Sequence, residues 1–345
     1  MWPNYSNMKT NTNNKYSNHA VYPIVRLRRL RKSTAVRELL QEVRLSAKDL
    51  ICPLFIEEGA TEPSVINSMP EIQRIPLHKA INEVETISDL GIKAIILFGI
   101  PSNKDDRGTS AFSDNGIIQQ STRLIRDHFG DKIAIITDVC LCQYTSHGHC
   151  GIVMNKKVDN DSSIKTLSRV AISHARAGAD FVAPSAMMDG QVKAIREGLD
   201  ESGFSDTAII GYSAKYASPL YGPFRDAAHC TPEYGDRRTY QMPFANTREA
   251  MHEIDEDIHE GVDIIMIKPA IPYLDVIYRA KSSTDLPIAA YSVSGEYALI
   301  KAAAMEGWID EDAIMTEFLT SIKRAGADII ITYHAKKMAQ LLLTE

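Results

Sequence analysis

The sequence GVDIIMIKPA, residues 261–270, contains the pattern that decides the predicted fold. Its glycine suits the left-handed residue that ends a helix, and its apolar run has the length of a buried strand. The preceding residues, Met251–Gly261, carry apolar side chains at helical spacing. Gly-Ala-Asp occurs at 178–180 and 326–328, again between a helical pattern and an apolar run. The stretch therefore predicts a helix-to-strand unit that recurs along the chain.

Apolar runs of this kind occur eight times, each rich in Ile, Val or Ala, as strands buried on both faces are. They are Leu50–Ile56, Ile92–Phe98, Ile133–Val139, Ala179–Pro184, Ala208–Tyr212, Val262–Ile267, Leu286–Tyr291 and Ala327–Thr332. Amphipathic stretches such as Ile164–Ala177 separate them. This alternation predicts an α/β protein with a single (β/α)8 TIM barrel over residues 36–345. A doubly wound sheet is the alternative, although no GxGxxG follows the first run.

Residues 1–35 precede the predicted barrel as an N-terminal arm. Residues 1–20 are Asn-rich, and we expect them to be disordered or to lie along a partner. A basic segment follows, containing Arg26, Arg28, Arg29, Arg31 and Lys32. It is either a solvated surface segment or an arm that packs on a neighbouring subunit.

The composition is ordinary for a soluble protein, with 44% hydrophobic and 24% charged residues among 345. A net charge of −6 gives no basic surface for nucleic acid. No apolar run approaches the length that spans a bilayer. Five cysteines in a chain of this length fit a reducing compartment better than a disulfide framework. We therefore expect a cytoplasmic enzyme with neither a membrane nor a nucleic-acid partner.

The stretch DVCLCQYTSHGHC, residues 138–150, holds Cys140, Cys142 and Cys150, three of the five cysteines. Their spacing differs from the paired CxxC motifs of a closed structural zinc module. Three thiolates would leave the fourth position of a tetrahedral zinc open to water or substrate, which is typical of catalytic zinc. The alternative is that they are ordinary buried thiols. We expect His147 and His149 to shape the loop rather than bind the metal.

The active site of a (β/α)8 barrel lies at the carboxyl ends of its strands. Residues with polar chemistry lie at the ends of six of the eight predicted strands. They are Asp138 with the cysteines, Ser185, Ser213 with Lys215, Lys268, Ser294 and Tyr333. The fold thus predicts that they converge on one face.

Lys215 and Lys268 end adjacent predicted strands. Burial lowers the pKa of an ammonium, and a second ammonium nearby lowers it further, so one amine becomes a nucleophile that attacks ketones. The alternative is that each lysine forms an ion pair with a carboxylate such as Asp138 or Asp275. Two lysines on neighbouring strands favour carbonyl chemistry.

The connection Tyr221–Gln241 is long, and long loops over a barrel mouth commonly act as lids. Arg225, Arg237 and Arg238 could bind a substrate carboxylate through paired hydrogen bonds. Alternatively they are solvated loop charges, neutralised by the neighbouring aspartates. Two cysteines outside the cluster, Cys52 and Cys230, are interpreted as structural.

Several motifs occur in order over roughly residues 23–340 and together resemble the porphobilinogen synthase (δ-aminolevulinate dehydratase) family. They are DVCLCQYTSHGHCG, APSAMMDG, YSAKYAS, YGPFRDA, GDRRTYQ, IKPAIPYLD, YSVSGEY and ADIIITY. The resemblance implies a lyase that condenses two molecules of 5-aminolevulinate to porphobilinogen with loss of two waters, in tetrapyrrole and heme biosynthesis.

The resemblance also implies residue roles. Lys268 would form the Schiff base with one substrate molecule, Lys215 would engage the other, and Asp138 would support the lysines. Cys140, Cys142 and Cys150 would bind zinc, and Glu249 would bind an allosteric magnesium. The implied substrate contacts are Arg225, Arg237, Gln241, Ser294 and Tyr333, together with Ser185, Tyr221 and Phe224.

One position departs from the family pattern, since residue 186 is alanine where many members carry aspartate. Asp138 and Asp189 remain available to orient the lysines. The resemblance further implies a homo-octamer in which Val21–Lys32 embraces neighbouring subunits.

Two other classes stay open from the residues alone. A class I aldolase-type barrel would use a lysine on the sixth strand but needs no thiolate cluster. A zinc-stabilised scaffold without activity needs no pair of lysines at the barrel mouth.

Overall fold

The computed structural model describes residues 22–344, so the expectation for residues 1–20 lies outside this range. The chain divides into two units, one ending at Arg44 and one beginning at Leu45. The first unit contains helix α1 (Thr34–Leu39), none of whose residues is buried. The sequence placed the boundary after residue 35. The structure places it later because Leu45 is the first residue that packs against the barrel's hydrophobic core.

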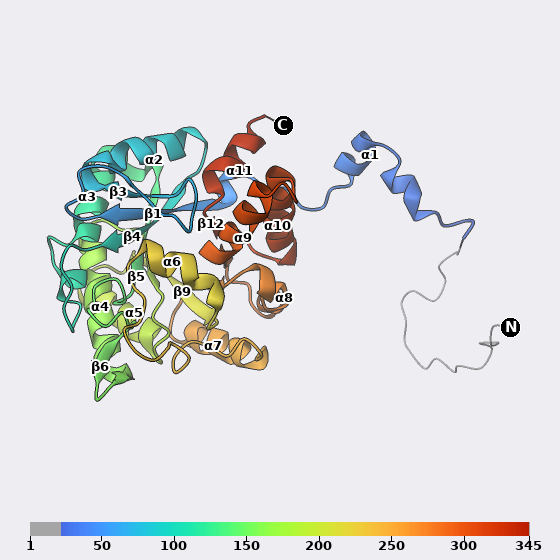
Figure 1. The fold of residues 1–345 in the computed structure, drawn as a ribbon. Coiled ribbons are helices and arrows are strands. Elements are labelled where there is room, and N and C mark those ends of the chain that lie inside the picture. The colour runs from blue at the N-terminus through green and yellow to red at the C-terminus, as the bar shows by residue number, and fades with distance from the viewer. Residues whose placement is uncertain (1–21, 345) are drawn as a thin grey trace, which may run out of the picture. The chain divides into compact units, whose positions relative to one another are not determined.

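The second unit is the predicted (β/α)8 barrel, which the structure confirms (Figure 1). Its parallel strands close into a ring because β12 pairs with β1. The barrel strands are β1 (Leu50–Glu57), β4 (Ala94–Ile100), β5 (Ala134–Val139), β8 (Phe181–Pro184), β9 (Ala208–Lys215), β10 (Ile264–Lys268), β11 (Ile288–Ser292) and β12 (Ile329–Thr332). Each overlaps one predicted run, and β9 and β10 extend far enough to include Lys215 and Lys268.

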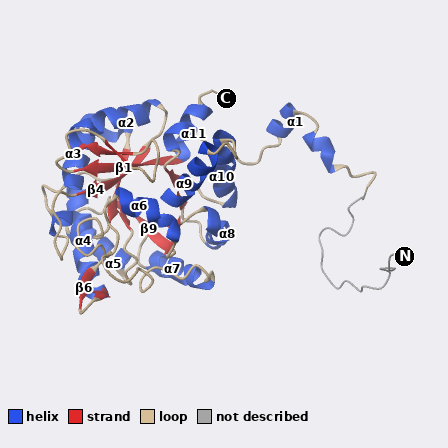
Figure 2. Ribbon diagram, in the orientation of Figure 1, coloured by secondary structure: helices blue, strands red, loops and turns tan. Residues whose placement is uncertain are grey.

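Helices surround the strands (Figure 2). They are α2 (Ala80–Asp89), α3 (Ile117–Phe129), α4 (Asn160–Arg176), α5 (Gln191–Glu201), α7 (Arg248–His259), α8 (Leu274–Ser283), α9 (Ser294–Met305), α10 (Glu311–Ala325) and α11 (Ala335–Leu342). The two predicted helical stretches correspond to α4 and α7, which each begin a few residues earlier than expected. No helix within residues 22–344 is long and apolar enough to cross a membrane.

Smaller elements lie outside the eight-fold alternation, and the sequence patterns did not predict them. Strands β2 (Ser64–Val65) and β3 (Gln73–Pro76) extend the sheet beside β1, while β6 (Ile152–Met154) and β7 (Lys157–Asp159) form a hairpin. The short helix α6 (Gly222–Ala227) lies in the long connection after β9.

The aspartates of the Gly-x-Asp motifs bind backbone N–H groups of the neighbouring strand. Asp180 precedes β8, and its carboxylate accepts a hydrogen bond of 2.7 Å from the backbone of Ile135 in β5. In the same way Asp263 accepts from the backbone of Ile209 in β9 at 2.7 Å, and Asp328 from that of Ile288 in β11 at 2.9 Å. The motif therefore ends a helix and also sets the register of the next strand.

Candidate active site

The polar residues predicted to converge do lie together at the carboxyl ends of the strands. Asp138, Ser185, Lys215 and Lys268 are buried, with 4–6% of their surface exposed. Ser294 and Tyr333 follow β11 and β12 and are also buried. The barrel mouth thus holds several polar side chains shielded from bulk solvent.

A β-bulge brings the two lysines side by side. Ile265 of β10 pairs with Gly211 of β9, but Ile267 pairs with Ala214, so β9 contains one extra residue between these positions. As a result Lys268 pairs with Lys215. Paired residues of adjacent strands project to the same face, so both amines point into the same space.

The surroundings of the two amines differ. The Lys215 amine donates a hydrogen bond to the carbonyl of Ser185. Burial lowers the pKa of Lys268 to about 7, and the positive charge of Lys215 acts in the same direction. Neither lysine takes part in the ion pairs of residues 22–344, so the ion-pair alternative, with Asp138 or Asp275 as partner, is not what the structure shows.

Asp138 is the carboxylate beside the lysines. Burial raises its pKa, and the charge of Lys215 opposes that effect. Gln143 donates to one of its oxygens at 3.2 Å. Asp189, the other expected candidate, is exposed and exchanges backbone hydrogen bonds with the amide of Asn160 at 2.9 and 3.0 Å. Asp189 therefore does not orient the lysines.

The sulfurs of Cys140, Cys142 and Cys150 lie within 4.8 Å of one another and are buried, so the cluster could hold a metal ion. The first two are 3.4 Å apart. Contacts from Cys140 and Cys142 lower the pKa of the Cys150 thiol well below its usual value, whereas burial raises that of Cys140 and contact with the neighbouring thiols raises that of Cys142. Metal ligation requires thiolates, and a cysteine with a depressed pKa supplies one readily.

Cys230 does not stand apart from this cluster, contrary to the prediction from sequence spacing. Interaction with the Cys142 thiol lowers the pKa of Cys230 to about 6. Cys52 lies apart as expected, and burial raises the pKa of its thiol to about 12.

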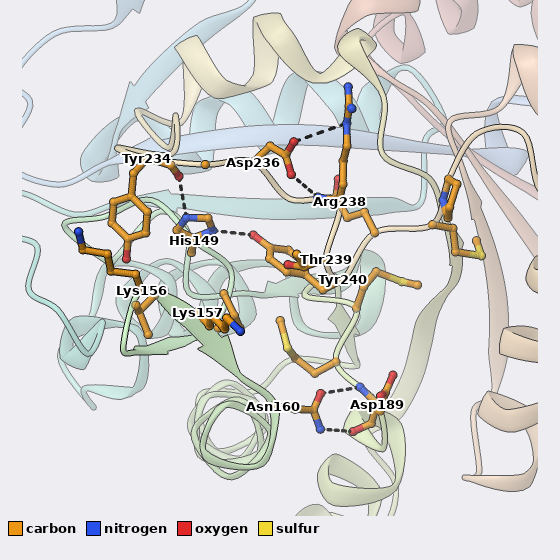
Figure 3. A pocket seen from close by; sticks show the side chains of 18 of the residues that line it. His149, Lys156, Lys157, Asn160, Asp189, Tyr234, Asp236, Arg238, Thr239 and Tyr240 are labelled. Carbon is orange, nitrogen blue, oxygen red and sulfur yellow. Dashed lines mark hydrogen bonds and ion pairs between the residues drawn. The ribbon is translucent and has the colours of Figure 1, made fainter.

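Both histidines of the cluster bind loop atoms. The ring of His149 contacts the Tyr240 hydroxyl at 3.1 Å and the Tyr234 carbonyl at 3.0 Å, as Figure 3 shows. The His147 ring lies 3.2 Å from the carbonyl of Asp106. These contacts support the expected loop-shaping role.

The first part of the 221–241 connection is anchored. Ser294 accepts a hydrogen bond from the backbone of Phe224 at 3.0 Å and donates to the carbonyl of Leu220 at 3.2 Å. Arg74 of β3 donates to the carbonyl of Ala227 at 2.7 Å. Because α6 is held at both ends, lid motion in this connection would fall on the more exposed residues 231–239.

The three arginines of the connection have different surroundings. Arg237 is buried and donates to the carbonyls of Gly148 and Cys230 at 2.9 and 2.6 Å. Arg225 is half-buried, whereas the exposed Arg238 lies 3.6 Å from the carboxylate of Asp236, as the solvated alternative predicted (Figure 3). In the 221–241 connection, four buried polar atoms find no partner among the described residues: Nε of Arg225, Nε of Arg237 and both amide atoms of Gln241. These groups are available to a polar ligand.

Glu296 is a buried residue near the site that the sequence patterns did not identify. It is buried, and its carboxylate accepts hydrogen bonds from Val293 at 2.5 Å and from Ile271 at 2.6 Å. Burial raises its pKa to about 7. The carboxylate joins the start of α9 to the segment that follows Lys268. A glutamate three residues into a helix was the available signal, as in a capping box.

An open cavity of about 850 Å³ lies beside the site and is drawn in Figure 3. Gln241 and His149 line it, as do Glu249 and Glu253 of α7. Glu249 accepts a hydrogen bond of 2.7 Å from the amide of Asn246. Glu249, the expected magnesium ligand, therefore lines this cavity from the first turn of α7.

A closed barrel with two buried amines and a cluster of thiols at one mouth defines an enzyme that acts on carbonyl compounds. The family model for delta-aminolevulinic acid dehydratase matches residues 24–341. The delta-aminolevulinic acid dehydratase of Archaeoglobus fulgidus is 54% identical over 323 residues, covering 94% of this chain and 99% of that protein. The enzyme of Synechococcus elongatus is 51% identical, covering 93% and 100%.

A solved structure agrees with these relatives. It is the Toxoplasma gondii delta-aminolevulinic acid dehydratase (porphobilinogen synthase) in complex with its product porphobilinogen. The chain matches it with a TM-score of 0.92 and 42% identity, over 96% of each chain. The chain belongs to the delta-aminolevulinic acid dehydratase family. The resemblance that the motifs indicated is thus confirmed, as is the expectation of an enzyme.

Replacing Lys215 by methionine should raise the pKa of Lys268, because it removes a like charge from a buried neighbour. We expect the midpoint for modification of Lys268 by trinitrobenzenesulfonate to move up by about one pH unit. Mass spectrometry of the peptide containing Lys268 measures this. Lys132→Met, an exposed change before β5, serves as the control and should leave the midpoint in place. An unchanged or lower midpoint in Lys215→Met would contradict the electrostatic account.

Proposed function

We propose that this site condenses two molecules of 5-aminolevulinate to porphobilinogen with loss of two waters. The pairing of Lys268 with Lys215, and the lowered pKa of Lys268, carry the proposal. The product named with the Toxoplasma gondii structure agrees with it.

The chemistry follows from the amines. At neutral pH a large fraction of Lys268 is unprotonated, so its nitrogen can add to a ketone carbon and expel water as a Schiff base. The Schiff base withdraws electrons and acidifies the neighbouring C–H bonds, which prepares carbon–carbon bond formation. Lys215 engages the second molecule, and Asp138 supports both amines. Holding both ketones in register contributes about 7–11 kcal/mol to lowering the barrier.

We assign the remaining substrate contacts to polar and aromatic side chains that could bind 5-aminolevulinate. Arg225, Arg237 and Gln241 would bind one molecule through their buried, unpartnered polar atoms. Ser294 and Tyr333 would bind the carboxylate of the other. The Ser294 hydroxyl would then exchange its hydrogen bond to Leu220 for the substrate. Ser185, Tyr221 and Phe224 would complete the walls.

Borohydride reduction tests the function directly. With 5-aminolevulinate bound, we expect a covalent adduct on Lys268, located by mass spectrometry, and none in Lys268→Met. An aldolase-type enzyme would instead be trapped by its own carbonyl substrates and not by 5-aminolevulinate. Absence of an adduct with 5-aminolevulinate would refute the proposed reaction.

We propose zinc as the metal of the Cys140–Cys142–Cys150 cluster. The three sulfurs are close enough to share one ion, and three thiolates leave a fourth tetrahedral position for substrate or water. A zinc ion there would supply a Lewis acid for a ketone oxygen, weakened by three negative ligands.

Cys142→Ala should reduce bound zinc from roughly one ion per chain to near none, because two thiolates hold zinc poorly. Activity should fall with it, while circular dichroism stays native. Cys52→Ala, at a buried thiol outside the cluster, should keep its zinc. After chelation, zinc alone should restore activity to the unaltered enzyme. Unfolding of Cys142→Ala would instead indicate a structural metal.

We further propose that Glu249 binds an activating magnesium at the start of α7, in the cavity beside the site. Its carboxylate lies near Glu253, whose pKa burial raises, with Asp189 and Glu249 adding to the effect. Carboxylates are the ligands that magnesium prefers.

Glu249→Gln should abolish stimulation by magnesium and preserve basal activity, because the change removes the charge and keeps the shape. Steady-state assays with and without magnesium measure this. Glu256→Gln, an exposed position on the same helix, is the control and should respond to magnesium normally. Full stimulation of Glu249→Gln would reject the assignment.

We propose that the arm packs on neighbouring subunits of an octamer. The apolar side chains of Tyr22, Ile24, Leu27 and Leu30 are 57–72% exposed, and a partner would cover them. We also propose a cytoplasmic location, because all five cysteines are unpaired thiols.

A further inference from the structure

The amine of Lys268 lies among four aromatic rings. The ring centre of Tyr291 is 4.1 Å from Nζ, and those of Tyr212, Tyr221 and Phe224 are 5.0, 5.3 and 5.4 Å away. These distances are within the range at which a ring face attracts a cation. The four rings, here called the Lys268 cage, come from β9, from β11 and from residues 221–224 of the anchored connection.

The cage distinguishes the two lysines. The Lys215 amine has a carbonyl as hydrogen-bond acceptor and a single ring, Tyr212, at 5.4 Å. The Lys268 amine makes no hydrogen bond with residues 22–344, so ring faces are its main neighbours. A positive charge on this nitrogen would therefore contact aromatic ring faces, and no anion would contact it.

We propose that the Lys268 cage binds the positively charged iminium that Lys268 forms with its ketone substrate. The neutral amine adds to the carbonyl carbon, and the oxygen leaves as water after taking one proton from nitrogen and one from solution. The C=N⁺ group that remains keeps one N–H. Its charge is spread over nitrogen and carbon and is weakly hydrated, and aromatic faces favour such cations.

Tyr291 is the main element of the cage. Its ring is nearest to Nζ and is fully buried. Its hydroxyl lies 3.0 Å from that of Tyr333, which fixes the ring plane relative to β12. Because it touches the reacting nitrogen, Tyr291 is a catalytic residue that acts through its π face.

Ring fluorination separates this electrostatic role from packing. The inference rests on the Schiff base proposed above. Tyr291→Phe is the reference, and phenylalanines with two and three ring fluorines at the same position weaken the π face at nearly constant shape. The measurement is the equilibrium constant for the borohydride-reducible adduct with 5-aminolevulinate on Lys268, as a function of pH. It should fall stepwise, by about tenfold from phenylalanine to the trifluorinated ring.

The same series at Phe55 is the matched control. Phe55 is fully buried and packs on Phe98 and Phe224, at 5.6 and 5.8 Å, but is not one of the cage rings. Its fluorination should leave the equilibrium constant unchanged. A flat series at Tyr291, or an equal trend at Phe55, would overturn the cage. Absence of any adduct in the unaltered enzyme would instead overturn the Schiff base.

Discussion

Two ammonium groups cannot both remain charged at low cost when they are buried side by side. The extra residue in β9 imposes that situation, because it aligns Lys215 with Lys268 at the mouth of the barrel. Without the bulge, Lys268 would face Ala214, and Lys215 would project to the other side of the sheet. Burial lowers the pKa of Lys268 to about 7, and the neighbouring charge of Lys215, which the bulge brings alongside, acts in the same direction. The proposed chemistry of the site rests on that lowered pKa.

The surrounding elements keep this arrangement rigid. Glu296 joins the start of α9 to the segment after Lys268, and Ser294 joins the same helix to α6. Arg74 of β3 fixes the other end of α6. Each anchor is a hydrogen bond to backbone atoms, so the geometry of the lysines depends on main-chain positions more than on surface loops.

The barrel and the convergence of its polar residues were predictable from sequence. The spacing of apolar residues, and the points where strands end, are each encoded within a short stretch of the chain. Three features were not. Asp189 lies near Ser185 in sequence but turns outward to Asn160, Cys230 is distant in sequence from the thiols it joins, and Tyr212 and Tyr291 read as ordinary strand residues. Each depends on which side chains meet in three dimensions, which spacing along one segment does not specify.

Aromatic faces suit Lys268 better than a carboxylate would. A carboxylate in contact with Nζ would stabilise the ammonium of the resting enzyme and the iminium alike, which raises the pKa and suppresses the nucleophile. A ring face attracts both cations, but the ammonium loses more hydration on burial because its charge is compact. Burial therefore lowers the pKa of the free amine even among four rings, while the delocalised iminium keeps their attraction. The one carboxylate nearby, Asp138, is accordingly held by Gln143 and forms no ion pair with either amine among the described residues.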